Sequence, residues 1–486
     1  MDYVNDLVTI LPELVLVGLL LTIITADLFM PRSAKWMLTP ITVVGLLIAG
    51  VACVVVWDTN RDVYSGFYVV DDLSVFLKGA TIVTGIFSTL FAPAYLSVRR
   101  IPLGEFNLVL VSALIGMCVL ASSGDLITLF LGLELMTMPS YVLTGLHKTD
   151  RYSNEGALKY FLLGSFASAI LLFGISWTFG LTGTTNIGEI AAAVSGQMSG
   201  GLLVAIGFLT VGATFKIAAV PFHYWTPDAY QGAPTPITGF LSVGPKIGAF
   251  ALLIRIFAEA LAPLRADWLS VFLVLAVLTM TLGNVVALTQ VNMKRMLAYS
   301  SIAHTGYIMA GIAAFANAGD QRVAQQGIQS VLFYLLGYAV MNIAAFAVVA
   351  MLQTDTRRFG GLNSFSGLAS RAPGRAAAMG ILMLSLTGIP PTVGFFAKLY
   401  VLLATVEAGL AWLAIIIVLN AALAAFYYLR VIVYMYMRDP EDDPAPLERS
   451  PAGSMALVLA VVAVIALGIF PGAILGMLEA SAASLF

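Results

Sequence analysis

Four charged side chains lie deep inside long apolar stretches of the sequence, where ionised groups are rare. Glu134 stands ten positions into the run DLITLFLGLELMTMPSYVLTGL, residues 125–146. Three lysines lie at similar depth in later apolar runs: Lys216, Lys246 and Lys398. An ammonium group at the middle of a membrane helix costs roughly 2.5–3.5 kcal/mol even on lenient insertion scales. Because glutamate and lysine change charge when their surroundings shift their pKa values, this set indicates a proton relay.

Three further residues are candidates for the same relay. His304, in YSSIAHTGY, titrates near neutral pH, and its hydroxyl neighbours suit a hydrated proton path: Tyr299, Ser300, Ser301 and Tyr307. His223 lies beside a predicted helix break, and Lys159 lies about five residues into its helix. Other roles stay open: structural hydrogen bonding for His304, loop capping for His223 and headgroup contact for Lys159.

Three more charges inside apolar runs are expected to be structural. Arg255 and Arg430 lie near the ends of their helices, from which long side chains reach the lipid headgroups. Replacing Arg255 by alanine is therefore expected to leave function intact. Lys78 adjoins Asp71 and Asp72, which favours an ion pair there.

The elements that hold these residues must be membrane helices. Of 486 residues, 60% are hydrophobic and only 10% are charged, with a mean hydropathy of +0.96, which excludes a water-soluble globule. The fold class is therefore an all-α polytopic membrane protein. Asp2 and Asp6, rather than lysines, precede the first apolar run, so we expect that helix to be retained. Cys53 and Cys118 have no metal-ligand spacing and no phosphate-binding glycine motif is present, so no cofactor is expected in this chain.

A membrane helix needs about 20 apolar residues, and the sequence contains about fourteen such segments. They lie near 8–30, 36–57, 70–97, 104–122, 125–146, 154–182, 200–225, 236–258, 268–290, 294–315, 326–352, 374–405, 411–437 and 453–478.

Lysine and arginine between these segments predict the orientation in the membrane, because cytoplasmic loops are enriched in them. One side carries fourteen: Arg32, Lys35, Arg99, Arg100, Lys148, Arg151, Lys294, Arg295, Arg357, Arg358, Arg371, Arg375, Arg438 and Arg449. The opposite side carries three: Arg61, Arg265 and Arg322. We therefore expect a multi-pass protein of the bacterial inner membrane with both termini in the periplasm.

Two predicted helices contain prolines at membrane depth. Pro221 follows Lys216 by five residues in the seventh helix, and Gly388, Pro390 and Pro391 precede Lys398 in the twelfth. Opened backbone at this depth is tolerated only against protein or water. The breaks are five helices apart, which predicts two inverted five-helix repeats, helices 4–8 and 9–13, with discontinuous helices 7 and 12. The expected units are 1–103, 104–260, 261–440 and 441–486, the middle two being the repeats.

Three segments resemble signature sequences of the antiporter-like membrane subunits of respiratory complex I: ATFKIAAVPFHYWTPDAYQGAPTPITGFLSVGPKIGAF, MKRMLAYSSIAHTGY and GIPPTVGFFAKLY. The resemblance covers nearly the whole chain. Within the family, fourteen helices, the lysine in helix 12 and the lack of a long C-terminal lateral helix resemble the subunit N branch of bacterial NADH:quinone oxidoreductase, rather than M or L.

The resemblance implies a proton-channel subunit driven by quinone reduction elsewhere in the complex. Glu134 and Lys216 would be the modulating pair, Lys246 the central relay and Lys398 the terminal one, and Lys159 matches another lysine that the family uses. FMN, iron–sulfur clusters and quinone would belong to partner subunits. The implied partners are subunit M on one side, the small subunits K and J on the other, and the lipid bilayer; no nucleic acid is expected.

Two other classes of protein are compatible with buried charges. An Mrp-type cation/proton antiporter subunit would share the same lysines, but the helix count and the helix 12 segment favour the complex I family. A membrane scaffold with inert ion pairs would need balanced central charges. The excess of central cations over anions argues against it.

Overall fold

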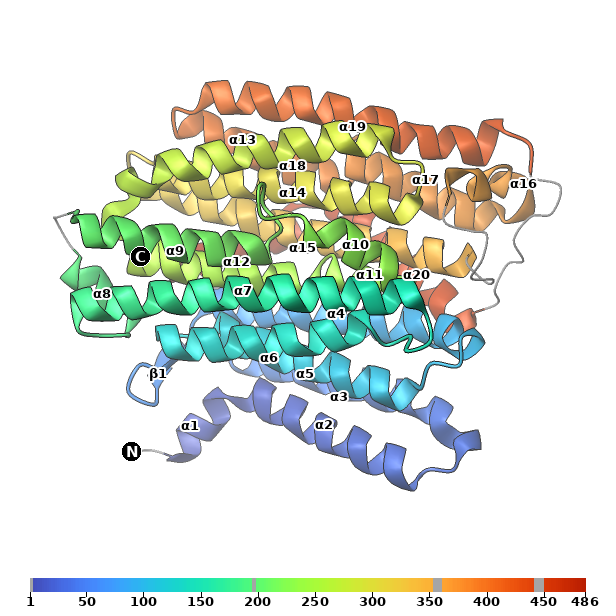
Figure 1. Cartoon of the computed structure of the whole chain (residues 1–486), viewed down its shortest axis with the longest axis horizontal. Helices are drawn as coiled ribbons and strands as arrows, with labels where there is room; N and C mark the ends of the chain where they lie inside the picture. The colour runs from blue at the N-terminus through green and yellow to red at the C-terminus, as the bar shows by residue number, and fades with distance from the viewer. Residues whose placement is uncertain (1–2, 195–197, 353–360, 441–449) are drawn as a thin grey trace.

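The computed structural model describes residues 3–194, 198–352, 361–440 and 450–486. Long helices run side by side along the longest axis of the molecule (Figure 1). Within the described ranges, eleven helical stretches are long and apolar enough to cross a membrane. They are α2 (Leu11–Phe29), η1 with α3 (Arg32–Met37, Leu38–Val55), α4 (Asp72–Val98), α5 (Leu103–Ala121), α6 (Leu126–Thr144), α7 (Arg151–Thr182), α11 to η2 (Thr235–Ala260), η3 with α13 (Ala262–Leu264, Arg265–Thr289), α15 (Gln321–Leu352), α19 (Ala411–Met437) and α20 (Pro451–Ile469).

The three remaining predicted spans are also helical, so each of the fourteen has a counterpart. One is α14 (Met293–Ala316). The other two are the helices predicted to be discontinuous, and both are broken. The seventh ends as α9 (Gly200–Lys216) and resumes as α10 (Trp225–Gly232); the twelfth consists of α17 (Pro373–Thr387) and α18 (Val393–Glu407).

A third break was not predicted. The expected continuous helix 236–258 is divided into α11 (Thr235–Leu241), α12 (Gly244–Leu253) and the π-helix η2 (Ile254–Ala260). Pro245 lies in the first turn of α12. Since proline has no N–H to donate and its ring collides with the carbonyl four residues earlier, the helix has to end before it and start again.

The two five-helix units have the same order of elements. Each begins with two neighbouring helices, α5 and α6 or α13 and α14, and continues with a helix of 32 residues, α7 or α15. A broken helix follows and packs against that long helix, through α9 on α7 and through α18 on α15. The final member is the α11–η2 stretch or α19.

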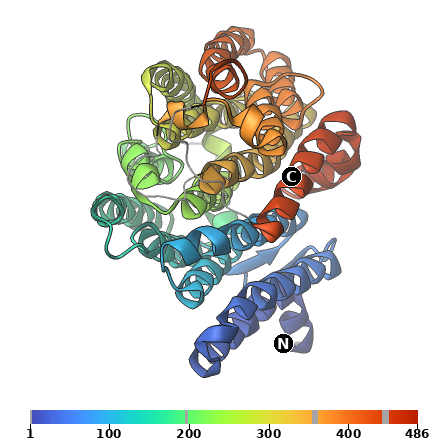
Figure 2. The same ribbon diagram turned by 90° about the vertical axis from the view of Figure 1, so that its right-hand side faces the viewer.

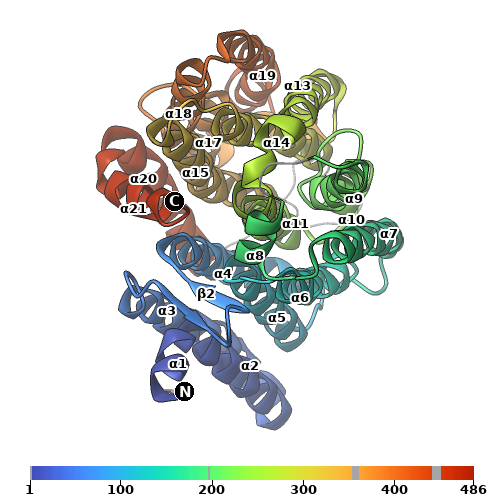
Figure 3. The ribbon, with the colours of Figure 1, turned by 90° about the vertical axis from the view of Figure 1, so that its left-hand side faces the viewer.

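Short elements gather at one end of the bundle. The hairpin of β1 (Arg61–Val63) and β2 (Tyr68–Val70) is antiparallel, with Asp62 opposite Val69. Figure 3 shows it near α8 (Ile187–Ala193) and the C-terminus, which follows α21 (Gly472–Ala483). The all-α expectation omitted this hairpin, because strands of three residues between apolar runs leave no recognisable pattern. The remaining short helices are α1 (Tyr3–Thr9), η4 (Leu362–Phe365) and α16 (Leu368–Arg371).

The N-terminal helices form a separate layer. Figure 2 shows α1–α3 on one side of the bundle, and α2 and α3 pack against α4 and α5. Many apolar side chains of α2 and α3 face outward, including Leu28 and Val54. In contrast, α15 and the α11–η2 stretch are almost entirely buried and lie at the centre. The candidate charges therefore have to be accommodated in a packed interior.

Candidate functional site: a chain of buried polar contacts

Glu134 and Lys216 are connected through a third residue. Ser168, on α7, donates a hydrogen bond of 2.5 Å to Glu134 Oε1 and accepts one of 2.9 Å from Lys216 Nζ. The expected direct ion pair is absent from the described ion pairs, because α7 packs against both α6 and α9 and supplies the bridge. A hydroxyl that accepts from an ammonium and donates to a carboxylate is arranged to pass a proton between them.

The two ends of this bridge differ in burial. Lys216 is 4% exposed and also approaches the Tyr141 hydroxyl at 3.4 Å. Glu134 is only partly buried, on a face of α6 whose apolar residues are exposed: Leu131, Leu135, Met138 and Val142. The carboxylate therefore lies at the lateral surface of this chain, where lipid or another membrane subunit has to cover it.

Lys246 lies in the first turn of α12, directly after the third break, and is 2% exposed. Its ammonium donates to the Ser301 carbonyl at 2.5 Å, to Ser301 Oγ at 2.7 Å and to Thr305 Oγ1 at 2.7 Å. Thr305 Oγ1 in turn donates to the Ile217 carbonyl at 2.9 Å. Since Ile217 follows Lys216, one threonine connects the first helix break to the central lysine.

His304 lies on α14 among tyrosines from two other helices. Its Nδ1 is 2.7 Å from the Tyr334 hydroxyl of α15, and its Nε2 is 3.0 Å from the Tyr428 hydroxyl of α19. Tyr428 also shares a short hydrogen bond with Ser300. Both ring nitrogens thus have hydroxyl partners, which suits either a satisfied core histidine or a proton path. Of the predicted hydroxyl neighbours, Ser300 joins this group and Ser301 binds Lys246.

Lys398 occupies the break of the second unit. Its ammonium donates to the carbonyls of Leu386 at 2.9 Å and Thr387 at 2.7 Å, at the C-terminal end of α17. A helix C-terminus carries partial negative charge, which stabilises a cation without a carboxylate. Gly388 has φ +92°, and a Cβ there would lie 3.0 Å from Lys398 Cδ. The positive φ therefore favours glycine at this turn, and its missing side chain leaves room for the lysine chain.

Lys159 and His223 lie outside this chain of contacts. Lys159 forms ion pairs of 2.8 Å with Glu155 and Asp228, and its side chain is 44% exposed. Asp228 also binds Arg295 at 2.9 Å. His223, between α9 and α10, is 7% exposed and stacks on Tyr224, and its Nδ1 has no hydrogen-bond partner among the residues that the structure describes.

The expectation that Arg255 reaches the headgroups is wrong. Arg255 is 2% exposed and forms ion pairs with Asp71 at 2.8 Å and Glu259 at 2.5 Å. Burial by itself would raise the pKa of Asp71, but the guanidinium lowers that pKa below its usual value. The helix end that carries Arg255 is covered by the hairpin and the start of α4, so its guanidinium contacts carboxylates of the protein and not lipid headgroups.

Of the other two charges expected to be structural, Lys78 has a different partner from the one expected. Lys78 is fully buried but pairs with Glu13 of α2 at 3.0 Å, not with Asp71 or Asp72. Arg430 binds the carbonyls of Leu288 and Gln290, at the end of α13, at 3.0 and 2.6 Å. Arg357, Arg358 and Arg449 lie outside the described residues.

Sequence reasoning missed four residues of the polar chain: Ser168, Thr305, Tyr334 and Tyr428. Each is a hydroxyl within an apolar helix. Serine and threonine in such helices commonly bond their own backbone carbonyls, as Thr144 does. The sequence therefore held no signal that separates a bridging hydroxyl from a locally satisfied one.

Comparisons with known proteins agree on one family. The family model described as "NADH:quinone oxidoreductase/Mrp antiporter, TM" matches residues 123–424. The subunit N of NADH-quinone oxidoreductase from Trichlorobacter lovleyi is 40% identical over 97% of this chain and 96% of its own length. The corresponding protein of Myxococcus xanthus is 40% identical over 99% and 98%.

Solved structures show the same fold. A chain of respiratory complex I from Thermus thermophilus with bound aureothin has a TM-score of 0.81 and 30% identity, covering 96% of this chain and 99% of that one. A chain of the Mrp complex from Dietzia has a TM-score of 0.85 at 23% identity, covering 99% and 97%.

Proposed function

The chain belongs to the NADH-quinone oxidoreductase subunit N group of the NADH:quinone oxidoreductase/Mrp antiporter family, and from this premise we propose how its buried charges translocate protons. It is a membrane subunit of the oxidoreductase, and its work is coupled to quinone reduction in other subunits. Forty per cent identity over nearly the full length favours this function over an Mrp-type antiporter, whose likeness at 23% identity concerns the fold.

The observation that carries the proposal is two sets of contacts, one from Glu134 through Ser168 to Lys216 and one from Ile217 through Thr305 to Lys246. The backbone between Lys216 and Ile217 brings the two sets together at the first helix break. A nearby carboxylate favours the charged form of a lysine. When Glu134 is neutralised or drawn away, Lys216 loses that stabilisation and releases its proton toward Lys246. His304 and Lys398 extend the path through the second unit. Lys159 and His223 lie outside these contacts and take no step in the proposed path.

The partners follow from the same premise. The protein lies in the membrane arm of a multi-subunit complex, with subunit M on one side and subunits K and J on the other. FMN, iron–sulfur clusters and quinone reside in other subunits. Glu134 on the lateral surface supports an interface there, because an ionised carboxylate facing lipid is costly. A partner that approaches or leaves this surface would change the charge balance at Glu134.

We assign both termini to the periplasm of a bacterial inner membrane, on the basis of the lysine and arginine distribution. Ser364→Cys, in the arginine-rich loop, should then react with a membrane-impermeant thiol reagent only in inside-out vesicles. Asn60→Cys, before the hairpin, should react only in intact cells. The native Cys53 and Cys118 are buried, so background labelling should be low. Labelling of Ser364→Cys from outside intact cells would reverse the topology.

The relay itself is tested at Glu134 and Ser168. Glu134→Gln and Ser168→Ala should both leave the complex assembled while proton translocation per complex falls, because each interrupts the path to Lys216. Ser165→Ala, three residues earlier on α7, is the matched control and should translocate normally. The measurement is quinone reductase activity together with formation of a pH gradient in membrane vesicles, normalised to assembled complex.

A structural role gives a different pattern. If the pair only stabilised the subunit, removing one partner would cost about 3–5 kcal/mol and reduce the amount of protein. Members of one functional unit are not additive. Combining Glu134→Gln with Lys216→Ala should therefore be no worse than either change alone. Normal pumping per complex in Glu134→Gln would refute the switch.

A further inference from the structure

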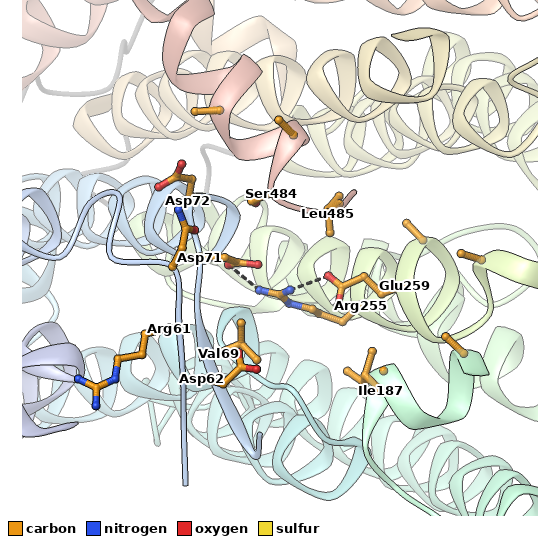
Figure 4. Close-up of a pocket in the computed structure, with 17 residues that line it drawn as sticks. Arg61, Asp62, Val69, Asp71, Asp72, Ile187, Arg255, Glu259, Ser484 and Leu485 are labelled. Carbon is orange, nitrogen blue, oxygen red and sulfur yellow. Dashed lines mark hydrogen bonds and ion pairs between the residues drawn. The ribbon is translucent and has the colours of Figure 1, made fainter. Parts of the chain in front are cut away.

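A cavity of about 690 Å³ opens at the end of the bundle that holds the hairpin. The hairpin, the start of α4, α8, η2 and the C-terminal residues after α21 line it. Figure 4 shows Arg255 between Asp71 and Glu259 on its wall. We call these three residues the outer latch. None of them belongs to the relay described above.

The outer latch joins three separate elements. Arg255 Nη2 binds Asp71 Oδ1, Nη1 binds Glu259 Oε1, and Nε and Nη2 both donate to the carbonyl of Ala121 at the end of α5. Asp71 is itself fixed, because it caps the start of α4 by accepting from the Ser74 N–H at 2.8 Å. The guanidinium therefore fastens η2 to the ends of α4 and α5.

The same segment carries Lys246 at its other end. The buried helix α12 begins after the break at Ser242 and Val243, holds Lys246 in its first turn and runs directly into η2. The segment from α12 to η2 is separated from α11 by the break at one end and fastened by Arg255 at the other. If the Arg255 contacts are lost, the segment can move as one body. The segment η2 is π-helical, and π-helical turns occur mostly as local bulges within α-helices, often at functional sites.

We propose that the outer latch positions Lys246 for proton transfer, and that protonation of Glu259 from the cavity loosens it. This rests on the proposed function, because Lys246 has to be a relay for its position to affect turnover. Glu259 lies on the same helix as Arg255 and holds the guanidinium in place toward Asp71 and the carbonyl of Ala121. A neutral Glu259 no longer holds it, and the contacts that fasten η2 to α4 and α5 then weaken. A lower pH on the outer side of the membrane therefore slows proton translocation.

Glu259 is the member of the latch that the cavity reaches most readily. Its side chain is 20% exposed, against 9% for Asp71 and 2% for Arg255. The charged residues that line the cavity with it are Arg255 on its own helix, Asp71 and Asp72 at the start of α4, and Arg61 and Asp62 on β1. Arg61 pairs with Asp6, and Glu189 on the neighbouring α8 is exposed and engaged by Thr184. Carboxylates outnumber cations here, so proton uptake by Glu259 relieves repulsion.

The test uses inside-out membrane vesicles, in which the lumen corresponds to the outer side. The external pH is held constant, the lumenal pH is lowered, and quinone reductase rate and proton uptake are measured per assembled complex. The wild-type rate should fall with lumenal acidification, by at most about tenfold per pH unit, the limit for one proton. Glu259→Gln should run at the low, acid-limit rate at every lumenal pH. Asp62→Asn and Glu189→Gln should keep the wild-type profile.

A wild-type rate that ignores lumenal pH, or a Glu259→Gln profile identical to the wild type, would overturn the latch. If Glu259→Gln fails to assemble, hydrogen exchange in the purified wild-type complex replaces it. Amides of residues 254–260 should lose protection on acidification, after correction for the intrinsic pH dependence of exchange; unchanged protection would overturn the proposal. Normal pumping in Glu134→Gln would instead refute the relay, so the two failures are distinguishable.

Discussion

Lys246→Ala is expected to abolish proton translocation while the subunit remains assembled. Lys246 connects the first helix break with the second unit through Ser301 and Thr305. On the proposed path, its removal deletes a group that takes up and releases the proton. The structure tolerates the loss because the described partners of Lys246 are the Ser301 carbonyl and the hydroxyls of Ser301 and Thr305, so no partner with a charge is left behind. Coupled turnover per complex should fall by at least about tenfold, equivalent to roughly 1.4 kcal/mol on the barrier.

A second substitution separates charge from proton transfer. Lys246→Arg keeps a cation at the site, but a guanidinium is not deprotonated in proteins. It should therefore fail to translocate protons as Lys246→Ala does. Lys35→Ala, which removes a partly exposed pair with Asp27, is the control and should pump normally. The readout is the pH gradient formed per quinone reduced in vesicles; active pumping by Lys246→Arg would exclude Lys246 as a titrating relay.

Arg255→Ala is expected to have the largest effect on the amount of protein. It leaves Asp71 and Glu259 without their shared cation and frees the carbonyl of Ala121. Breaking a buried ion pair from one side costs about 3–5 kcal/mol. The pKa of Asp71 is lowered in the folded protein, so its stabilising contribution is present at neutral pH and is lost only as the pH falls through the acidic range. Immunoblots of membranes should show much less subunit than wild type.

Charge compensation tests the cause of this loss. Combining Arg255→Met with Asp71→Asn and Glu259→Gln removes all three charges and should restore much of the protein, because no buried charge is left unpaired. Pumping should stay impaired in this triple variant if the latch positions Lys246. A normal amount of the Arg255→Ala protein would mean that the arginine reaches the headgroups after all.

The sequence by itself determined the architecture. Apolar length sets which segments cross a membrane, and each of the fourteen predicted segments has a helical counterpart. Proline acts on its own helix within four residues, so the breaks after Lys216 and before Lys398 could be located without any tertiary information. Pro245 marks the break before Lys246 in the same way, although that break was not predicted from the sequence. The depth of the four central charges also follows from position along these helices.

The tertiary structure decided which partner each charge has. Ser168 stands between Glu134 and Lys216 because α7 packs between their helices, and Lys78 pairs with Glu13 because α2 covers α4. Arg255 and Asp71 are 184 positions apart along the chain yet share an ion pair. Helical periodicity states which face a residue occupies but not which helix lies against that face. A buried charge is stabilised by whatever polar group that neighbour presents, so its role could be assigned only once the helices were packed.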